Sequence, residues 1–329
     1  MKSDQVKQSL PAASVVLVAS AGVESIERLL TCLRRQTIAG ELEVVLAARP
    51  HHVAALNAIP AGNLYAIHAV EADFSTSARA RAAAIAKVEG PIIIFCEDHA
   101  FPIGDDWAER FIAAHSSGYA AVGPVVRNAN PATPASWANL AVEYGPWMHS
   151  VRAQEVDTLP GHNSSYKRAV LARYGNALSD VLEAEWVLHK DLRENGETLY
   201  LDPGIAVEHL NFSRLGATLK LHFFEGWMFA ASRSATWGWA QRLLYTVAFP
   251  AIACVRFVRV SRDLMANPEA KGHALRSLPM CFFLLTISAL GEGIGYALGD
   301  CNRRGTLGEM EFDRWKNLRA NERNLTRAA

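Results

Sequence analysis

Residues 75–107 read STSARARAAAIAKVEGPIIIFCEDHAFPIGDDW. The first half of this stretch is rich in alanine and opens with three hydroxyl side chains, which predicts a helix over 75–89 with a capped N-terminus. Gly90-Pro91 ends that helix, and the run IIIFC that follows is continuously apolar, as in a strand buried on both faces. Three polar residues, Glu97-Asp98-His99, come directly after this strand. The stretch therefore predicts a helix, a buried strand and a polar strand end in succession.

The flanking sequence repeats this alternation. Strands are predicted at 14–20 (SVVLVAS), 43–47 (EVVLA), 65–70 and 120–126, and strand-like runs follow at 198–201 and 206–207. Helices are predicted over 105–115, over 183–195, and around Ile26, Leu29, Leu30 and Leu33, which recur at helical spacing. Strands that alternate with helices predict an α/β fold with a Rossmann-type, mostly parallel sheet flanked by helices.

The balance of charge changes along the chain. Residues 1–212 carry 17 Lys and Arg against 24 Asp and Glu, whereas residues 213–329 carry 16 against 9. In the second part, the apolar runs 243–255 and 278–290 are shorter than the roughly 20 residues that a membrane-spanning helix needs. Aromatic side chains between 222 and 242 alternate with arginines, a pattern typical of a membrane interface. We predict two domains, 1–212 and 213–329, the second made of interfacial or short membrane helices; a helical core packed on the first domain is the alternative.

The cysteines and the N-terminus indicate the compartment. Five cysteines lie far apart without a C-x-x-C pair, so neither a zinc site nor a secreted disulfide framework is predicted. The first residues, MKSDQVKQSLPAAS, lack the apolar core of a signal peptide. We expect a peripheral or monotopic protein on the cytoplasmic face of the cell membrane, without a nucleic-acid partner.

The polar strand end is the candidate site. Ligands of open parallel sheets bind beyond the carboxyl ends of the strands, where Glu97, Asp98 and His99 are expected to lie. Carboxylate oxygens and an imidazole can hold a divalent cation, and such a cation can bridge a diphosphate. A capped strand end with surface charges is the alternative.

The order SVVLVAS, LLTCLRRQT, ELEVVLA and then SARARAAAIAKVEGPIIIFCEDHAFPIGDDW resembles glycosyltransferase family 2, whose members are inverting enzymes of GT-A fold. In that family, a strand of this kind ends in an Asp-x-Asp motif, and a Pro and an acidic-Trp pair follow. Glu97 and His99 stand where the two Asp usually stand, and Pro102 and Asp106-Trp107 come at the matching positions. The resemblance covers about residues 14–210. It implies a GT-A-like fold and a nucleotide-sugar donor bound by Glu97 and Asp98.

The chain also departs from the family pattern. The first strand runs into Ala19-Ser20-Ala21-Gly22 instead of Pro-Thr-Tyr-Asn, and the second ends in Ala47-Ala48-Arg49 without the Asp that reads the base. A His in place of an Asp favours Mn²⁺ over Mg²⁺, so the cation expected is Mn²⁺ or Mg²⁺, with metal dependence itself in question. Ser20 is an expected donor contact. Arg79 is another, because it takes the place of the family's Arg at a helix N-terminus, where phosphate binds readily; a solvated helix face is its alternative.

Three further positions match the family. Gly161 and Asn163 match a Gly-x-Asn loop that contacts the donor, where glycine permits close approach and asparagine both donates and accepts hydrogen bonds. An N-cap pair before a surface helix is the alternative there. His209, after the last short strand, corresponds to a His that completes the metal or diphosphate site. Glu97, His99 and His209 are therefore expected to surround one cation.

Glu185 is the candidate catalytic base. It falls on the inward stripe that Leu182, Leu188 and Leu192 mark on the helix 183–195, with His189 one turn further along. Burial of a carboxylate raises its pKa toward the range useful to a base, and we expect that shift here. The family's catalytic Asp stands at the position of Glu185, with Glu183 as the fallback. A structural salt bridge is the alternative.

The resemblance and the residues together predict an inverting hexosyltransferase. It would move a sugar from a nucleoside-diphosphate sugar to a hydroxyl of a lipid-linked or cell-envelope glycan acceptor. The alternative is a GT-A-like protein that binds a nucleotide or glycan at the membrane without transfer. A nicotinamide-dependent dehydrogenase is disfavoured, because Ser20-Ala21-Gly22-Val23 lacks the G-x-G-x-x-G pattern after the first strand.

Overall fold

The structure is a computed structural model that describes residues 10–149, 152–301, 310, 312, 317–320 and 322–326. The strands are β1 Ala13–Ala19, β2 Leu42–Ala48, β3 Ala66–Glu71, β4 Ile92–Cys96, β5 Ala100–Ile103, β6 Ala121–Asn128, β7 Gln154–Glu155, β8 Ser165–Lys167 and β9 Leu199–His209. The helices around them are α1 Val23–Arg34, α2 Pro50–Asn57, α3 Ser77–Ile85, α4 Trp107–Ser116, α5 Pro134–Tyr144, α6 Arg168–Ala172, α7 Leu178–Leu182 and α8 Glu185–Glu194. Four more helices follow: α9 Leu215–Arg233, α10 Trp239–Val247, α11 Phe249–Ala266 and α12 Ala274–Leu298.

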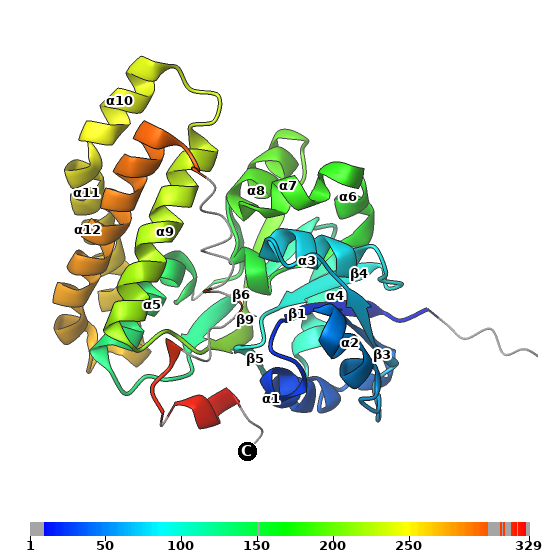
Figure 1. The fold of residues 1–329 in the computed structure, drawn as a ribbon. Coiled ribbons are helices and arrows are strands. Elements are labelled where there is room, and N and C mark those ends of the chain that lie inside the picture. The colour runs from blue at the N-terminus through cyan, green and yellow to red at the C-terminus, as the bar shows by residue number, and fades with distance from the viewer. Residues whose placement is uncertain are drawn as a thin grey trace, which may run out of the picture.

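The strands form one sheet in the order β3-β2-β1-β4-β8-β6-β9-β5, with β7 paired to β9. The first four strands of this order are parallel, whereas β8 is antiparallel to both of its neighbours and β5 is antiparallel to β9. The predicted α/β fold, a sheet flanked by helices, is confirmed, and the sheet is mixed rather than parallel throughout (Figure 1). Because β1 and β4 are parallel neighbours, Ser20 and Glu97 both emerge at their shared carboxyl edge.

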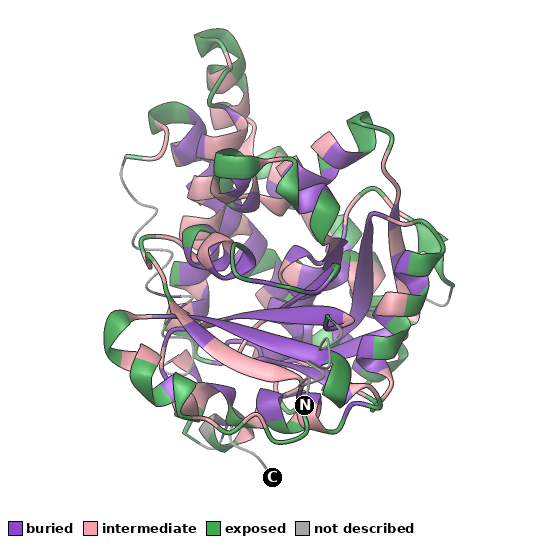
Figure 2. Cartoon of the chain, turned by 90° about the vertical axis from the view of Figure 1, so that its right-hand side faces the viewer, coloured by how far each residue is buried: buried purple, intermediate pink, exposed green. Residues whose placement is uncertain are grey.

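Helices cover both faces of the sheet, which explains why its strands are apolar without alternation. In β1, Val15 and Leu17 pack into a core with α1 and α4, while Val16 packs into a second core with α3 and α8. Figure 2 shows the strands buried and the exposed residues on the outer sides of the helices. The site at the carboxyl edge therefore rests on a sheet held from both sides.

Most expected elements are present within a residue or two of their predicted ends. The four apolar residues of the first helix, Ile26, Leu29, Leu30 and Leu33, are all buried in α1. The predicted helix 75–89 is shorter, because α3 begins at Ser77, where the Thr76 hydroxyl accepts a hydrogen bond from the backbone N–H of Arg79, and ends at Ile85. The runs 198–201 and 206–207 belong to one strand, β9, with an irregularity in its pairing to β6. The elements α2, α5, α7, β5, β7 and β8 were not predicted.

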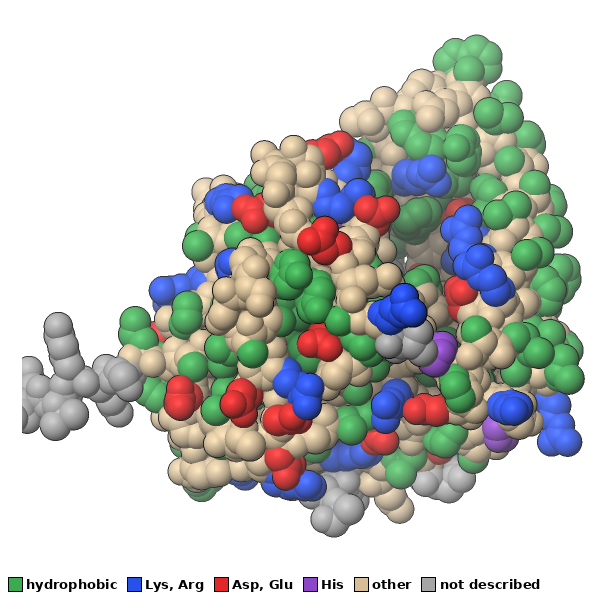
Figure 3. Space-filling view, turned by 180° about the vertical axis from the view of Figure 1, so that it is seen from behind, with side chains coloured by type: hydrophobic (Ala, Val, Ile, Leu, Met, Phe, Trp, Pro, Cys, Tyr) green, Lys and Arg blue, Asp and Glu red, His purple; other side chains and the backbone are tan. Residues whose placement is uncertain are grey.

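The second part of the chain is a layer of helices beside the sheet domain. The predicted boundary at 212 lies between β9 and α9. The apolar run 243–255 is divided between α10 and α11, which are bent by 61° at their junction, and the run 278–290 lies within α12. Among the described residues, α12 alone is long and apolar enough to cross a membrane, with mean hydropathy 1.6 and 56% of that window buried; the bent pair α10 and α11 qualifies only as a broken span. In Figure 3, hydrophobic side chains gather along the edge of the molecule that these helices form.

Candidate active site

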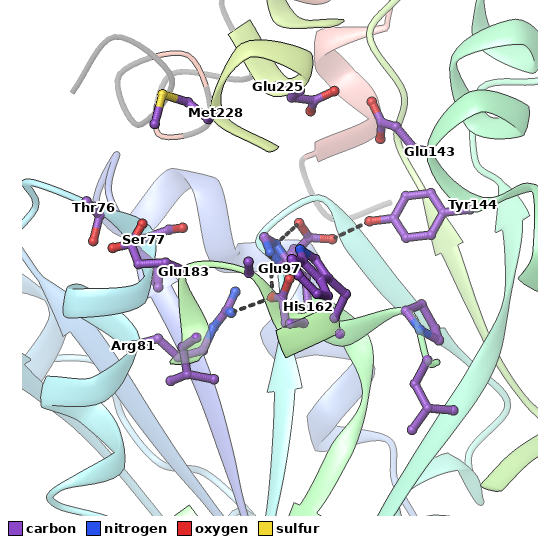
Figure 4. Close-up of a pocket in the computed structure, with 18 of the residues that line it drawn as sticks. Thr76, Ser77, Arg81, Glu97, Glu143, Tyr144, His162, Glu183, Glu225 and Met228 are labelled. Carbon is purple, nitrogen blue, oxygen red and sulfur yellow. Dashed lines mark hydrogen bonds and ion pairs between the residues drawn. The ribbon is translucent and has the colours of Figure 1, made fainter. Parts of the chain in front are cut away.

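A cavity of about 560 Å³ lies at the carboxyl edge of β1 and β4. It is lined by the ends of these strands, the N-terminal turn of α3, the loop before β8, the start of α8 and one face of α9. Figure 4 shows Glu97 and His162 near its centre, with Arg81 on one side, Tyr144 on the other, and Glu225 and Met228 of α9 across the cavity. The cavity therefore joins the sheet domain to the helical layer.

Glu97 follows directly after β4 and contacts more of the site's side chains than any other residue that the structure describes in this cavity. Its side chain is 10% exposed. One oxygen accepts hydrogen bonds from Asn163 Nδ2 at 2.7 Å and the Tyr144 hydroxyl at 3.3 Å, and the other lies 3.1 Å from His162 Nδ1. Burial raises the pKa of Glu97, but the nearby His99 and His162 outweigh it and hold the pKa well below its usual value. Glu97 is therefore an ionised carboxylate in a nearly buried place.

His162 connects Glu97 to Glu185. Its Nε2 lies 2.7 Å from Glu185 Oε1, which also accepts a hydrogen bond from Arg81 at 3.1 Å. Burial lowers the pKa of His162, yet the carboxylates on both sides raise it to about 10. The same contacts act in reverse on Glu185: burial raises its pKa, and His162 and Arg81 lower it to about 2. The expectation that the pKa of Glu185 is raised is therefore wrong, because desolvation is outweighed by two cationic neighbours.

Glu185 is the first residue of α8, two residues after the predicted start of this helix. Leu182 belongs to the preceding helix α7, so the inward stripe is shared between two helices. A carboxylate in the first turn of a helix is stabilised by the helix dipole, which also favours the ionised form. Gly161 packs so closely against this side chain that a Cβ at position 161 would lie 2.3 Å from Glu185 Cγ. Glycine is therefore required at 161 for Glu185 to lie where it does.

The three predicted metal ligands are brought together. Ligand atoms of Glu97, His99 and His209 lie within 4.8 Å of one another. His99 Nδ1 is 2.8 Å from the Asp98 carboxylate and His209 Nδ1 is 2.8 Å from the Asn211 side-chain oxygen. Both imidazoles thus use Nδ1 for a supporting partner, and their Nε2 atoms lie 3.5 and 3.6 Å from the Glu97 carboxylate.

This arrangement fits a divalent cation. Metal-binding histidines usually give one ring nitrogen to a carboxylate or carbonyl oxygen, which orients the other toward the metal. Two imidazoles with one carboxylate suit borderline ions such as Mn²⁺ or Zn²⁺ better than the all-oxygen preference of Mg²⁺. The donor set therefore favours Mn²⁺ of the two cations expected from the sequence.

The other predicted residues lie at different depths. Ser20 lines the cavity, and its hydroxyl donates to the backbone oxygen of Phe312 at 2.6 Å. Asp98 and Gly161 also line it, whereas Asn163 is buried and reaches the site through its hydrogen bond to Glu97. Arg79 is more than half exposed, pairs with Asp73 and does not line the cavity.

Three residues of the site were not singled out from the sequence. Arg81 lies two positions after Arg79, and its side chain, 4% exposed, lies over the ring of Phe95 and reaches Glu185. The repeat Ser-Ala-Arg-Ala-Arg contains both arginines, but nothing in it tells which one faces the sheet. His162 stands inside the Gly-x-Asn loop, as the unassigned middle residue. Tyr144 carried no signal, because its contact with Glu97 depends on how α5 crosses the strand ends.

A second group of side chains that could bind metal lies on the opposite wall. Glu143 of α5 and His222 and Glu225 of α9 have ligand atoms within 4.8 Å of one another. Asn139 joins them, since its oxygen lies 2.9 Å from His222 Nε2 and its amide donates to Glu143 at 2.9 Å. We interpret this group as the polar part of the contact between α5 and α9.

No family model matches the chain, and no curated protein matches it. Among solved structures, the mannosyltransferase PcManGT from Pyrobaculum calidifontis in complex with GDP-Man and Mn²⁺ is similar with 18% identity, 94% of this chain and 87% of that chain covered, and a TM-score of 0.48. GalNAc-T7 with UDP, GalNAc and Mn²⁺ is similar with 14% identity, 61% and 43% covered, and a TM-score of 0.46. TarS 1-349 of S. aureus in complex with UDP is similar with 12% identity, 82% and 70% covered, and a TM-score of 0.39.

Proposed function

We propose that the protein is an inverting glycosyltransferase that moves a sugar from a nucleoside-diphosphate sugar to an acceptor hydroxyl. One observation carries this proposal. Glu97 belongs to a cluster of side chains that could bind a cation, and the imidazole of His162 connects it to the ionised carboxylate of Glu185. Sugar transfer with inversion needs these two functions side by side, one to stabilise the leaving diphosphate and one to accept the proton of the attacking hydroxyl. The resemblance of the sequence to family 2 supports the same assignment.

Glu185 is the proposed base. It is ionised at neutral pH, because Arg81 and His162 hold its pKa at about 2, so it can accept a proton but is a weak base in this state. The diphosphate of a donor is an anion that would attract the same two cations. Arg81 and His162 would then interact less strongly with Glu185. The pKa of Glu185 would rise toward the range useful to a general base as the donor binds. In this proposal the donor itself activates the base.

The remaining site residues would hold the donor. A divalent cation on Glu97, His99 and His209 would neutralise charge on the departing diphosphate. Asp98 and Asn211 keep the two imidazoles oriented, and Asn163 and Tyr144 keep the Glu97 carboxylate in place. Ser20 and Gly161 offer polar and close backbone contacts at the cavity wall. Arg79 would contact the donor only after leaving Asp73.

The proposed acceptor side of the cavity combines apolar side chains with Glu183 and Glu225. Trp186, Met228 and Phe229 line it between Glu185 and α9. We infer that the acceptor is a lipid-linked or cell-envelope glycan, and that the protein works at the cytoplasmic face of the cell membrane as a peripheral or monotopic protein. The exposed hydrophobic residues of α10, α11 and α12 support the association with a membrane.

A thermal-shift screen of nucleotide sugars with and without Mn²⁺ tests donor binding, because a ligand that binds the folded state raises the melting temperature by mass action. A donor that stabilises the protein is then tested for hydrolysis and transfer, with the anomeric configuration of the product read by NMR. We expect Glu185→Gln to abolish transfer while the donor-dependent shift remains. The matched variant Glu183→Gln removes the neighbouring carboxylate of the cavity and is expected to retain turnover.

One observation favours a second candidate, a GT-A-like protein that binds donor without transfer: the pKa of Glu185 is about 2, low for a general base. Donor binding without any turnover would favour that candidate. Full turnover of Glu185→Gln would refute the base assignment, and the absence of any binding or turnover with nucleotide sugars would refute both.

A further inference from the structure

The helical layer encloses an ion pair, while many of its outward-facing side chains are apolar. Glu292 of α12 is 3% exposed and forms an ion pair with Arg256 of α11, whose guanidinium also donates to Ser288 at 3.3 Å. Water-soluble helix bundles usually bury apolar side chains and expose charges. Ionisable residues turned inward and paired with one another are typical of helices that face lipid.

The contact between α9 and α12 has the same character. A Cβ at Gly291 would lie 2.1 Å from the backbone oxygen of Phe223, and one at Gly295 would lie 2.3 Å from that of Trp227. The two backbones thus touch through glycines. Small residues at helix contacts are the usual packing device in membranes, where no hydrophobic effect drives helices together.

The outer surface of these helices is apolar. Of the fifteen large hydrophobic side chains that are exposed in the described part of the chain, twelve lie between 239 and 298. Helix α10 has no buried residue, and Trp239 is 80% exposed. The exposed members on α10 and the following turns of α11 are Trp239, Leu243, Leu244, Val247, Val255 and Val258.

On α11 the apolar surface is interrupted by two arginines, and one exposed apolar side chain of this helix, Met265, lies beyond them. Val258 is 70% exposed, and the next exposed side chains along the helix are Arg259 and Arg262. The segment from Phe249 to Val258 is ten residues, or about 15 Å of helix at about 1.5 Å per residue. That length matches half of a hydrocarbon core about 30 Å thick.

Helix α12 is too firmly held at its start to span a bilayer. Its residues Cys281, Leu284 and Leu285 belong to the same core as Trp137 of α5, within the body of the protein. Only residues 286–298 extend beyond that core, which is about 20 Å of helix against the roughly 30 Å that a span requires. The tip of the layer, residues 239–258 and 286–298, can therefore reach the middle of a bilayer but not its far side.

We propose that this tip inserts into one leaflet of a membrane that contains anionic lipids, with Arg259 and Arg262 at the level of the headgroups. The inference rests on the membrane association proposed above and adds its depth, its orientation and the lipid charge. It also assigns an amphiphile as the acceptor class, because the end of α9 that carries the cavity-wall residues Met228 and Phe229 packs against the part of α12 that belongs to the tip. An amphiphile anchored in the leaflet would reach Glu185 without leaving the membrane.

Flotation with vesicles of phosphatidylcholine, with and without phosphatidylglycerol, tests the insertion. We expect the double variant Leu243→Asp/Leu244→Asp to partition at least about a hundredfold more weakly, since Asp is strongly disfavoured in hydrocarbon where Leu is favoured. The fold should tolerate these changes because α10 has no buried residue. The matched control is Leu215→Asp, at an exposed leucine outside the tip, which is expected to bind vesicles as the wild type does.

Two measurements address charge and depth. Arg259→Ala/Arg262→Ala is expected to lose about tenfold or more of its binding to phosphatidylglycerol vesicles and none of its binding to pure phosphatidylcholine. A fluorophore attached at Leu244→Cys is expected to be quenched most by lipids with a nitroxide at the end of the acyl chain. Strongest quenching by headgroup nitroxides would indicate a span or a surface-bound helix, and either overturns the proposal.

The remaining outcomes are also decisive. Unchanged vesicle binding of the Leu243→Asp/Leu244→Asp variant overturns the proposal. The proposal is also overturned if the wild-type protein does not bind vesicles but forms a dimer, and this variant disrupts the dimer. The apolar tip would then be an interface between two copies. Vesicle binding does not depend on sugar transfer, so a failure here and a failure of the donor screen are told apart directly.

Discussion

Replacing Gly161 by Ala is the most specific test of how the site is built. The added Cβ would lie 2.3 Å from Glu185 Cγ and 2.5 Å from its Cβ, where ordinary contact begins at 3.4 Å. Because these atoms are near the backbone, rotation of the far end of the side chain cannot relieve the overlap. Glu185 and the loop at 161 must therefore separate by about 1 Å, and a misplacement of about 1 Å in a catalytic group costs on the order of a hundredfold in rate.

We expect kcat/KM for transfer to fall about a hundredfold in Gly161→Ala. Mn²⁺ affinity is expected to fall much less, because His99 and His209 lie outside the loop at 161 and only Glu97 contacts it, through His162 and Asn163. The free energy of unfolding should fall by about 1–3 kcal/mol, the usual cost of overpacking. Steady-state kinetics with the donor found by the thermal-shift screen, metal titration and urea unfolding measure the three quantities.

The control for this variant is Gly216→Ala, at a glycine in α9 whose added Cβ would meet nothing within 4 Å. It is expected to keep wild-type kinetics and stability. Wild-type kcat/KM in Gly161→Ala would show that Glu185 does not need its present position, and the assignment of the base would fail. A loss of Mn²⁺ affinity as large as the loss of rate would show instead that the whole loop had collapsed.

Three further outcomes are expected. Glu43 lies 3.3 Å from His68 and holds the pKa of that imidazole above 6.5. The pair therefore stabilises the fold fully below pH 6.5, and less as the pH rises through the raised pKa. His68→Gln should lower the free energy of urea unfolding by up to about 1 kcal/mol on the acid side and by less on the alkaline side. Asp98→Asn removes the carboxylate that orients the neighbouring imidazole and should weaken Mn²⁺ binding about 10–100-fold by calorimetry, whereas unchanged affinity would place the cation elsewhere. Gly291→Ala forces a Cβ to 2.1 Å from a backbone oxygen of α9 and should lower the free energy of unfolding by about 1–3 kcal/mol. No such loss is expected for Gly216→Ala, whose added Cβ meets nothing within 4 Å.

The fold was largely predictable because its strands are buried on both faces. Some patterns can be recognised from the sequence alone, namely the continuous apolar runs of β1 and β4 and the helical spacing of apolar residues in α1. The elements that were missed lack such a signal. β8 is three residues long, and it becomes a strand only because β4 and β6 offer it partners on both sides, a contact between distant parts of the chain. β5 likewise depends on pairing with β9.

The sequence predicted the candidate metal ligands and Glu185, but not Arg81, His162 or Tyr144, and not the electrostatics of the site. Glu97 and His99 follow β4, and His209 ends β9. The rule that parallel strands present their carboxyl ends at one edge, together with the family resemblance, is enough to place them together. The pKa of Glu185 could not be predicted from the sequence. Burial and cationic neighbours shift it in opposite directions, and only the positions of Arg81 and His162 decide which effect is larger. Both neighbours are also suited to an anionic donor, so we expect the pKa of Glu185 to differ between the donor-free and the donor-bound protein. A titration of Glu185 with a bound nucleoside diphosphate is therefore the measurement that separates a weak base from one that awaits its substrate: a raised pKa in the complex supports transfer, and a pKa still near 2 supports a protein that only binds.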